Sequence, residues 1–329
     1  MRIADNDIQR PSASSLLAVV VVYKLCPSKS STLQTLLATA KNVSSEELNL
    51  KIVVWDNTPG GQEIEKLPDG VSYVSAPENP GLALAYNHVL ALAEAEGYEW
   101  LLTLDQDSLL PADFLKRISD LTCKLGPVEK IGAIVPQVIA GGRIMSPFHF
   151  IFKAIPRLFP RGFVGIWKGA VYAANSGAVL RVNAVREIGG YDLMFPLDLS
   201  DTSLFHRLHA SGKQVFISGD LSMGHDFALH NKQTRMSIQR YDASLLDDCA
   251  FWDMYMGPLA RFERVVRFSV RALKELFTPE AADFRRRTVL ELRRRLFTTR
   301  KARIAAWRTW ATRRRDESSA STHLQQRAI

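Results

Sequence analysis

The stretch Trp100-Leu101-Leu102-Thr103-Leu104-Asp105-Gln106-Asp107-Ser108 is an apolar run that ends in two carboxylates separated by one residue. The run has the length and composition of a buried strand. Because alternate side chains of an extended segment point the same way, Asp105 and Asp107 can reach one cation just beyond that strand. Two hard oxygen donors suit Mg2+ or Mn2+, which commonly bridge the phosphate oxygens of a substrate. The stretch therefore predicts a metal site for a nucleotide diphosphate or a similar phosphate ester. The simpler alternative is that both acids are solvated and that Asp107 caps a helix beginning near Pro111.

The rest of the chain alternates between strand-like and helix-like segments. Helical character marks Leu33–Lys41 and Ala83–Ala95. Further strand-like runs lie at Leu17–Tyr23, Lys51–Trp55, Ser72–Ser75 and Ile131–Val135. This alternation predicts an α/β fold with a mostly parallel central sheet flanked by helices, in which ligands bind beyond the carboxyl ends of the strands. Residues 141–168 are rich in Pro, Phe and Arg and predict a long loop or lid.

Composition and cysteine content restrict the class of protein. With 329 residues and 47% hydrophobic content, the chain can form one large globular domain and an extension. Cys26, Cys123 and Cys249 are far apart and form no CxxC or Cys/His cluster, which disfavours zinc or disulfide frameworks and favours a reducing compartment. The apolar run Leu16–Leu25 is short and contains Lys24, so we interpret it as a buried strand and not as a signal peptide or membrane span.

The positive charge is concentrated near the carboxyl end. Residues 261–315 contain 18 Lys and Arg against 5 Asp and Glu, whereas the whole chain has a net charge of +8. Three arginine triplets lie there, at 285–287, 293–295 and 313–315, interleaved with Phe, Leu and Trp. An apolar stripe with basic flanks and tryptophans is typical of an interfacial helix on anionic lipid. We therefore expect residues 261–315 to contact an anionic membrane surface, in preference to nucleic acid, and the protein to lie at the cytoplasmic face of the cell membrane.

Five short motifs occur in a fixed order along the chain. They are Val19-Val20-Val21-Val22-Tyr23, Val54-Trp55-Asp56-Asn57-Thr58, Glu78-Asn79-Pro80-Gly81-Leu82-Ala83, Leu104-Asp105-Gln106-Asp107-Ser108 and Asn175-Ser176-Gly177-Ala178. Together they resemble the inverting family-2 glycosyltransferases of GT-A fold. More narrowly, Asp-Gln-Asp-Ser and the Asn-Pro-Gly stretch are similar to the bacterial rhamnosyltransferase branch. The resemblance covers residues 15–230.

The resemblance implies a donor site and a metal site. Metal binding would fall to Asp105, Asp107 and His225, with Mn2+ or Mg2+ as the cofactor. The implied donor-binding residues are Tyr23, Asp56, Asn79, Gly81, Asn87, Asp105 and Gln106. Simpler roles remain open: Asp56 can shape a turn, Asn87 can be a surface helix residue, and His225 can be structural or replaced by the neighbouring His230.

The resemblance also implies a catalytic base after Gly189-Gly190-Tyr191-Asp192. Inversion at the anomeric carbon requires a carboxylate that takes the proton of the acceptor hydroxyl. Asp201 is the candidate, and Asp198 is its competitor. Asp201 could instead cap a helix over Ser203–Ser211. Ser203 stands where many relatives have glutamate, and the arginine-rich stretch of the family is not recognisable in residues 241–248.

The implied activity is that of a metal-dependent inverting glycosyltransferase in cell-surface polysaccharide synthesis. It would move a sugar, L-rhamnose from dTDP-L-rhamnose, to a glycan or lipid-linked glycan. Residues 1–235 would form the GT-A domain (nucleotide-sugar half 15–125, acceptor half 126–235), 236–315 a basic helical extension, and 316–329 a disordered tail. Homo-oligomerisation is left open.

Two alternatives belong to other classes. The first is an aspartate-nucleophile phosphohydrolase, in which Asp105 attacks phosphorus, Asp107 acts as the acid, and Gly219-Asp220 resembles a later metal motif. The second is a non-catalytic binding subunit with the same fold.

Overall fold

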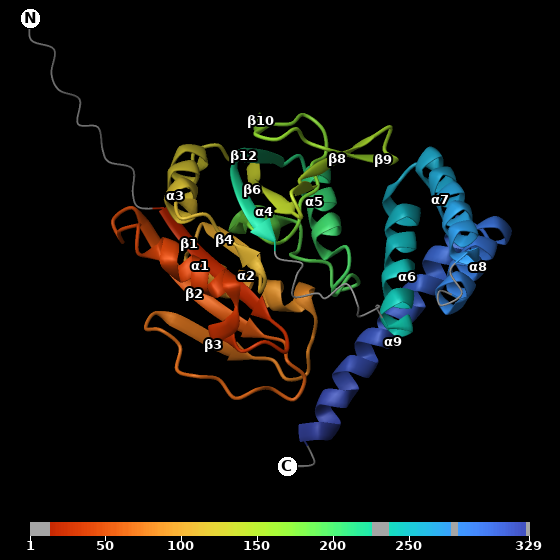
Figure 1. Cartoon of the computed structure of the whole chain (residues 1–329), viewed down its shortest axis with the longest axis horizontal. Coiled ribbons are helices and arrows are strands. Elements are labelled where there is room, and N and C mark those ends of the chain that lie inside the picture. The colour runs from red at the N-terminus through yellow and green to blue at the C-terminus, as the bar shows by residue number, and fades with distance from the viewer. Residues whose placement is uncertain (1–13, 226–236, 278–281, 327–329) are drawn as a thin grey trace, which may run out of the picture.

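The strand that carries the two carboxylates, β4 (Trp100–Asp105), lies inside a ten-stranded sheet. The computed structural model describes residues 14–225, 237–277 and 282–326 (Figure 1). On one side of β4 the sheet continues through β1 (Ser14–Val22), β2 (Leu48–Asp56) and β3 (Val71–Ser75), and all four strands are parallel. The predicted parallel α/β core is therefore confirmed.

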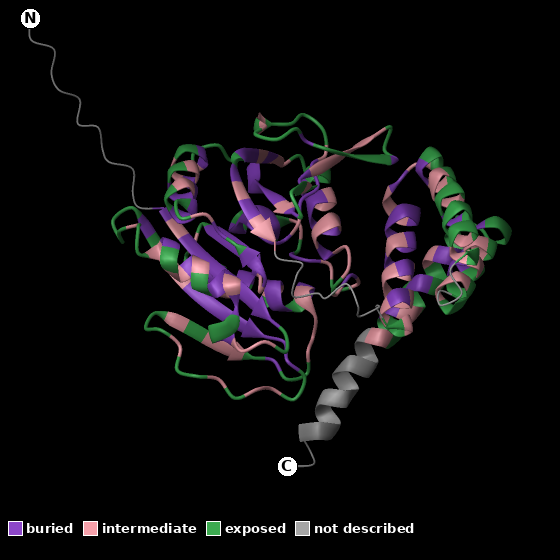
Figure 2. Ribbon diagram, viewed as in Figure 1, coloured by how far each residue is buried: buried purple, intermediate pink, exposed green. Residues whose placement is uncertain are grey.

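Strand periodicity divides the side chains of β1 between two faces of the sheet. Leu16, Ala18, Val20 and Val22 pack with α1 (Ser31–Ala40) and α3 (Phe114–Leu125), whereas Leu17, Val19 and Val21 pack with α2 (Leu82–Ala95). A strand that is buried on both faces reads as a continuous apolar run, which explains the valine-rich sequence of β1. Figure 2 shows these strands as the buried centre of the molecule.

The other half of the sheet is mixed. Strand β11 (Ala178–Arg181) is antiparallel to both β4 and β6 (Ile131–Ala140), and β12 (Gln214–His225) is parallel to β6. Two reversals restore the direction, so β6 and β12 run the same way as β4. As a result the ends of β4 and β12 lie at one edge of the sheet. Two helices, α4 (Val182–Glu187) and α5 (Ser200–Ala210), complete this half.

The prediction of a loop over residues 141–168 was wrong, because this segment forms short strands. A Gly141-Gly142 turn with positive φ angles returns the chain into β7 (Arg143–Ser146), which pairs with β6. Two further strands, β8 (Phe148–Ile151) and β9 (Ile155–Leu158), form a hairpin, and β10 (Val164–Ile166) pairs with β12. Aromatic contacts stabilise the segment, as Phe148 stacks on Tyr172 at 5.6 Å between ring centroids. Such cross-strand pairs do not appear as a local pattern in the sequence.

Four helices follow the sheet: α6 (Ile238–Tyr255), α7 (Pro258–Leu276), α8 (Ala282–Phe297) and α9 (Arg300–Gln326). They form the helical extension that the sequence predicted, and this extension shares the main hydrophobic core, because Phe251 of α6 and Trp307 of α9 are buried together with Phe195. Helix α9 ends at Gln326 and therefore includes residues 316–326, where the polar composition predicted a disordered tail. Residues 327–329 lie outside the described part of the chain.

Several arginines of the basic region are used inside this helical bundle. The Asp253 carboxylate pairs with Arg303, at 2.8 and 3.0 Å, and with Arg295 at 3.4 Å. Asp247 pairs with Arg314 at 3.2 Å and accepts a hydrogen bond from the Trp307 indole at 3.1 Å. Both acids lie on α6, so the arginines of α8 and α9 fasten these helices to it. Within the described residues, no helix combines the length and apolar character needed to cross a membrane.

Candidate active site

The turn Asp105–Ser108 leaves β4 at the edge of the sheet and is held by hydroxyl groups. The Thr32 hydroxyl, at the start of α1, donates to the Asp105 carbonyl at 2.5 Å and accepts from the Ser108 amide at 2.7 Å. From the other side, the Ser176 hydroxyl accepts from the Asp105 amide at 3.1 Å. These contacts fix the backbone on both sides of Asp107, whose side chain is buried.

His225 reaches the same turn because β12 ends there. The short strand β5 (Ser108–Leu109) pairs antiparallel with β12 and sets His225 opposite Ser108. The imidazole Nε2 lies 3.5 Å from Asp107 Oδ1, and Nδ1 lies 3.2 Å from Ser108 Oγ. Three predicted metal-binding residues that are up to 120 positions apart in sequence thus occupy one edge of the sheet.

The electrostatics of this edge show an excess of negative charge. Burial, followed by the charges of Asp107 and Asp201, raises the pKa of Asp105 to about 6, while His225 acts in the opposite direction. The Tyr86 hydroxyl of α2 lies 3.4 Å from Asp105 Oδ1, within hydrogen-bonding distance. Close carboxylates that the protein neutralises incompletely favour a cation.

The residues present fit a divalent cation. Two carboxylates and one imidazole supply the oxygen and nitrogen donors that Mn2+ and Mg2+ accept. In the described parts of the chain, no three His, Cys, Asp or Glu side chains are arranged as a complete metal site. A cation bound here would therefore take further ligands from water and from a diphosphate, as Mg2+ commonly does.

Asp201 lies inside the first turn of α5 and does not cap it. The helix begins at Ser200, with Leu199 in the left-handed region at its N-cap. The Asp201 carboxylate accepts from the amide of Thr202 at 2.5 Å and from its hydroxyl at 3.1 Å. Burial, and to a lesser degree the charge of Asp198, raise the pKa of this carboxyl. The charge of Asp201 in turn contributes to the raised pKa of Asp105.

Asp198 has a partner of its own. Its carboxylate forms a bidentate ion pair with Arg240, in which Nη2 and Oδ1 are 2.7 Å apart and Nη1 bonds Oδ2. A carboxylate held by a guanidinium is a weaker proton acceptor than a free one. Between the two competing acids, the geometry therefore favours Asp201 as the base.

Two predicted donor residues lie on neighbouring loops. The Tyr23 amide donates to the side-chain oxygen of Gln106 at 2.8 Å, which ties the end of β1 to the carboxylate turn. The Asp56 carboxylate accepts from the Thr58 amide, the Gln62 side chain and the Tyr73 hydroxyl, at 2.8, 2.8 and 2.6 Å. Asp56 therefore stabilises the turn after β2, which is the simpler role that the sequence left open for it.

The Asn79–Asn87 segment serves mainly to join the two halves of the domain. Gly81 has a φ of 88°, and an added Cβ would lie 2.6 Å from the Pro196 carbonyl oxygen, so only glycine fits. The Asn87 side-chain amide forms two hydrogen bonds with the backbone of Tyr191, accepting from the amide at 2.7 Å and donating to the carbonyl at 2.9 Å. Asn79 also adopts a positive φ of 50° in the preceding turn.

The sequence analysis missed Thr32 and Tyr86. Thr32 follows two serines at a helix start, where hydroxyl residues are expected as caps. Tyr86 precedes Asn87 in an apolar helix and reads as a core residue. Its contact with Asp105 depends on the packing of α2 against β4, for which the sequence contains no local signal.

Asp220, which the phosphohydrolase alternative requires for its later metal motif, is paired with an arginine. Asp220 forms an ion pair with Arg117 of α3, and the same guanidinium donates to the Asp220 carbonyl at 2.9 Å. His230, the competitor of His225, lies outside the described residues.

The sheet order and the carboxylate-bearing strand end define the GT-A class of α/β fold. A family model described as "Glycosyl transferase family 2" matches residues 18–189. The chain belongs to this family. No curated protein matches the chain significantly.

Two solved structures align with this chain. The crystal structure of GalNAc-T7 with UDP, GalNAc and Mn2+ aligns with a TM-score of 0.52 and 14% identity, over 78% of this chain and 51% of that chain. Our chain thus spans about half the length of that protein. S. aureus TarS aligns with a TM-score of 0.47 and 11% identity, over 81% of this chain and 44% of that chain.

Proposed function

We propose that the protein is a metal-dependent, inverting glycosyltransferase that uses a nucleotide-diphospho sugar. The observation that carries this proposal is that Asp105, Asp107 and His225 lie together at one edge of the sheet. The charge of Asp201 also acts on Asp105. Membership of glycosyl transferase family 2 supports it. The UDP and Mn2+ in the GalNAc-T7 structure support the choice of donor class and of Mn2+ or Mg2+ as the cofactor.

In this proposal each residue has a defined task. Asp105 and Asp107 hold the cation, and Asp107 is kept in place by the hydroxyl-bonded turn and by His225. When bound, the cation supplies Lewis-acid neutralisation of the charge on the departing nucleoside diphosphate. Asp201 accepts the proton of the acceptor hydroxyl while that oxygen attacks the anomeric carbon from the face opposite the leaving group. The raised pKa of Asp201 makes its carboxylate a stronger proton acceptor than an ordinary aspartate.

The specific donor is dTDP-L-rhamnose in this proposal, supported by the resemblance of Asp105-Gln106-Asp107-Ser108 and Asn79-Pro80-Gly81 to rhamnosyltransferases. The acceptor is a growing surface glycan or its lipid-linked precursor. A lipid-linked acceptor requires the enzyme to work at a membrane surface.

A thermal-shift measurement tests the donor site. The full chain is heated with dTDP-L-rhamnose, UDP-N-acetylgalactosamine or GDP-mannose, each with Mn2+, Mg2+ or EDTA. We expect dTDP-L-rhamnose with a metal to raise the melting temperature, because a ligand that binds the folded state stabilises it by about 2.7 kcal/mol at a hundredfold excess over Kd. Asp107→Ala should abolish the shift. Asp113→Ala, which changes an exposed acid outside the carboxylate turn, should retain it.

Each other outcome decides against part of the proposal. A metal-dependent shift with another nucleotide sugar would replace rhamnose as the donor. The absence of a shift with every nucleotide sugar would favour the non-catalytic binding subunit. Release of phosphate from p-nitrophenyl phosphate without an acceptor would favour the phosphohydrolase.

A further inference from the structure

Helix α7 carries an apolar stripe on its outer face. The stripe consists of Leu259, Phe262, Val266, Val270, Leu273 and the following Phe277, spaced by three or four residues, and these side chains are between 46% and 82% exposed. Such spacing lines up on one side of a helix over roughly 27 Å. The opposite side of α7 holds the buried Phe268, which packs against α6 and α8. Figures 1 and 2 show α7 at the periphery, with its exposed surface away from the sheet.

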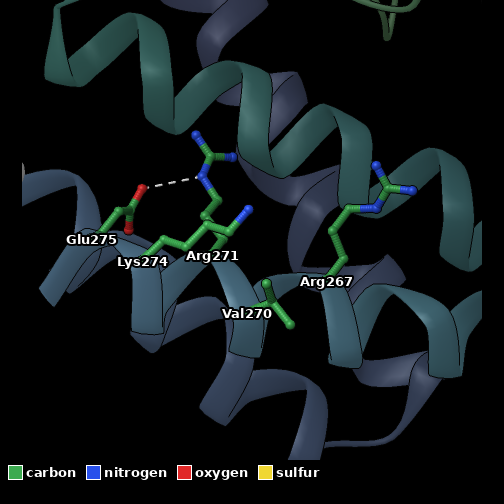
Figure 3. Close-up of a pocket in the computed structure, with 5 residues that line it drawn as sticks. All are labelled: Arg267, Val270, Arg271, Lys274 and Glu275. Carbon is green, nitrogen blue, oxygen red and sulfur yellow. Dashed lines mark hydrogen bonds and ion pairs between the residues drawn. The ribbon is translucent and has the colours of Figure 1, made fainter. Parts of the chain in front are cut away.

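A basic flank accompanies the stripe. Arg267, Arg271 and Lys274 lie beside it, together with Val270 of the stripe and Glu275, around a shallow pocket of about 340 Å³ (Figure 3). The Arg271 guanidinium reaches over the Tyr241 ring of α6, 4.8 Å from its centroid, and bonds Glu275 at 3.1 Å. The pocket thus joins an apolar edge to three cations, of which Arg267 is paired with Glu263 at 2.6 Å and Arg271 with Glu275. This combination suits a phosphate attached to an apolar chain.

Charge complementarity identifies the occupant of this face. The arginines of α8 and α9 that bind Asp247 and Asp253 are turned into the bundle, so they do not contribute to a contact surface. The cations that border the α7 stripe are exposed instead. Apolar side chains flanked by exposed cations match the boundary between the acyl chains and the phosphates of an anionic bilayer.

We propose that α7 is the membrane-docking element of this protein. The stripe enters the headgroup–acyl boundary of an anionic bilayer with the helix axis parallel to the surface, and Arg267, Arg271 and Lys274 bind lipid phosphates. The inference rests on the proposed function in one respect, because docking brings a lipid-linked acceptor to the enzyme. A second pocket, lined by Arg267 and Arg271 and also by Asp198 and Leu199, extends from this flank toward the loop before Asp201.

Vesicle co-sedimentation of the full chain tests the docking face. Vesicles of phosphatidylcholine alone are compared with vesicles that contain an equal amount of phosphatidylglycerol. We expect the wild-type protein to bind the anionic vesicles, and the triple variant Phe262→Ser, Leu273→Ser, Phe277→Ser to lose at least about 10-fold in affinity. Arg267→Gln with Lys274→Gln should lose a similar factor and the preference for anionic lipid.

Matched controls use exposed residues elsewhere. Phe152→Ser with Leu158→Ser, on the β8–β9 hairpin, and Lys29→Gln with Lys41→Gln should sediment like the wild type. Equal sedimentation of the triple variant and the wild type would overturn the proposal. So would a wild-type dimer, seen by light scattering, that the triple variant converts to a monomer, since the stripe would then bind a second copy. Donor-induced thermal shifts of the variants are read separately, so a failure of the donor site leaves the vesicle result intact.

Discussion

Arg240, in the first turn of α6, holds Asp198 in a bidentate ion pair and thereby anchors the loop that leads into Asp201. The pair connects the helical bundle to the segment that carries the candidate base. A guanidinium suits this task because its two parallel N–H groups fix direction as well as distance. Arg240 is thus a positioning residue for a carboxylate that it does not touch.

Arg240→Gln is expected to lower kcat about 10- to 100-fold and to leave the KM for the donor unchanged, because the base is misplaced while the carboxylate turn is intact. Steady-state kinetics of sugar transfer provide the measurement. Adding Asp198→Asn to the Arg240 variant should cost little more, since both changes break the same pair. Additive losses would show that the two residues act independently.

Asp201→Asn is expected to lower kcat by about 100- to 10,000-fold, because the amide cannot take the proton from the hydroxyl of the acceptor. Donor affinity, measured by calorimetry with Mn2+, should stay within a factor of about 2, since an amide keeps the size of the carboxylate and its hydrogen bonds to Thr202. A variant that retains transfer would exclude Asp201 as the base. A variant that fails to fold would give it a structural role instead.

Asn87→Ala separates a structural role from donor binding. The change removes two hydrogen bonds to the buried Tyr191 backbone, so we expect the free energy of unfolding to fall by about 1 to 3 kcal/mol in urea titrations. The Kd of the donor should be unaltered. If donor affinity falls while stability does not, Asn87 contacts the nucleotide.

Asp247 should make stability depend on pH. Burial raises its pKa to about 6, although Arg314 and the Trp307 indole oppose the rise, whereas the ordinary value is 3.8. Between these values the folded protein binds more protons than the unfolded chain, so this group lowers the free energy of unfolding as pH rises from about 4 to 7. The loss amounts to about 2 to 3 kcal/mol. The difference in urea stability between the wild type and Asp247→Asn should change across this range; a constant difference contradicts the raised pKa.

Trp307→Ala is expected to lower the free energy of unfolding by about 3 to 5 kcal/mol, because it empties a buried site beside Phe195. Thermal unfolding gives the measurement. Phe297→Ala, at a side chain that is 83% exposed, serves as the control and should change stability by less than about 0.5 kcal/mol. Similar effects of both changes would mean that α9 is not part of the core.

The parts of the fold that depend on local periodicity were predictable from the sequence. The apolar run of β4 and the helix over α2 follow directly from residue pattern. Pairing over long distances was not predictable: the hairpin strands of residues 141–168 depend on partners elsewhere in the chain. The basic region was unpredictable for the same reason. The sequence indicates that Arg303 is a surface charge, whereas in the structure it pairs with Asp253, 50 residues away.

The residues of the candidate site also differ in how far local sequence predicts them. Asp105 and Asp107 could be recognised because they follow one strand. His225 and Asp201 required the resemblance to a family, since they reach the site only through sheet order. Asn87 was assigned to the donor by that resemblance alone, and its bonds to the Tyr191 backbone have no counterpart in the sequence pattern.

The contact between Phe195 and Trp307, with ring centroids 5.0 Å apart, has a consequence for biosynthesis. A ribosome makes the sheet first, and domains fold as units while synthesis proceeds. Here Phe195 can reach its partner only after a tryptophan more than a hundred residues later has been synthesised. Until α9 has been synthesised, the face of Phe195 that Trp307 covers in the folded protein has no such cover. Helix α9 thus completes the part of the core around Phe195 only after it has itself been synthesised.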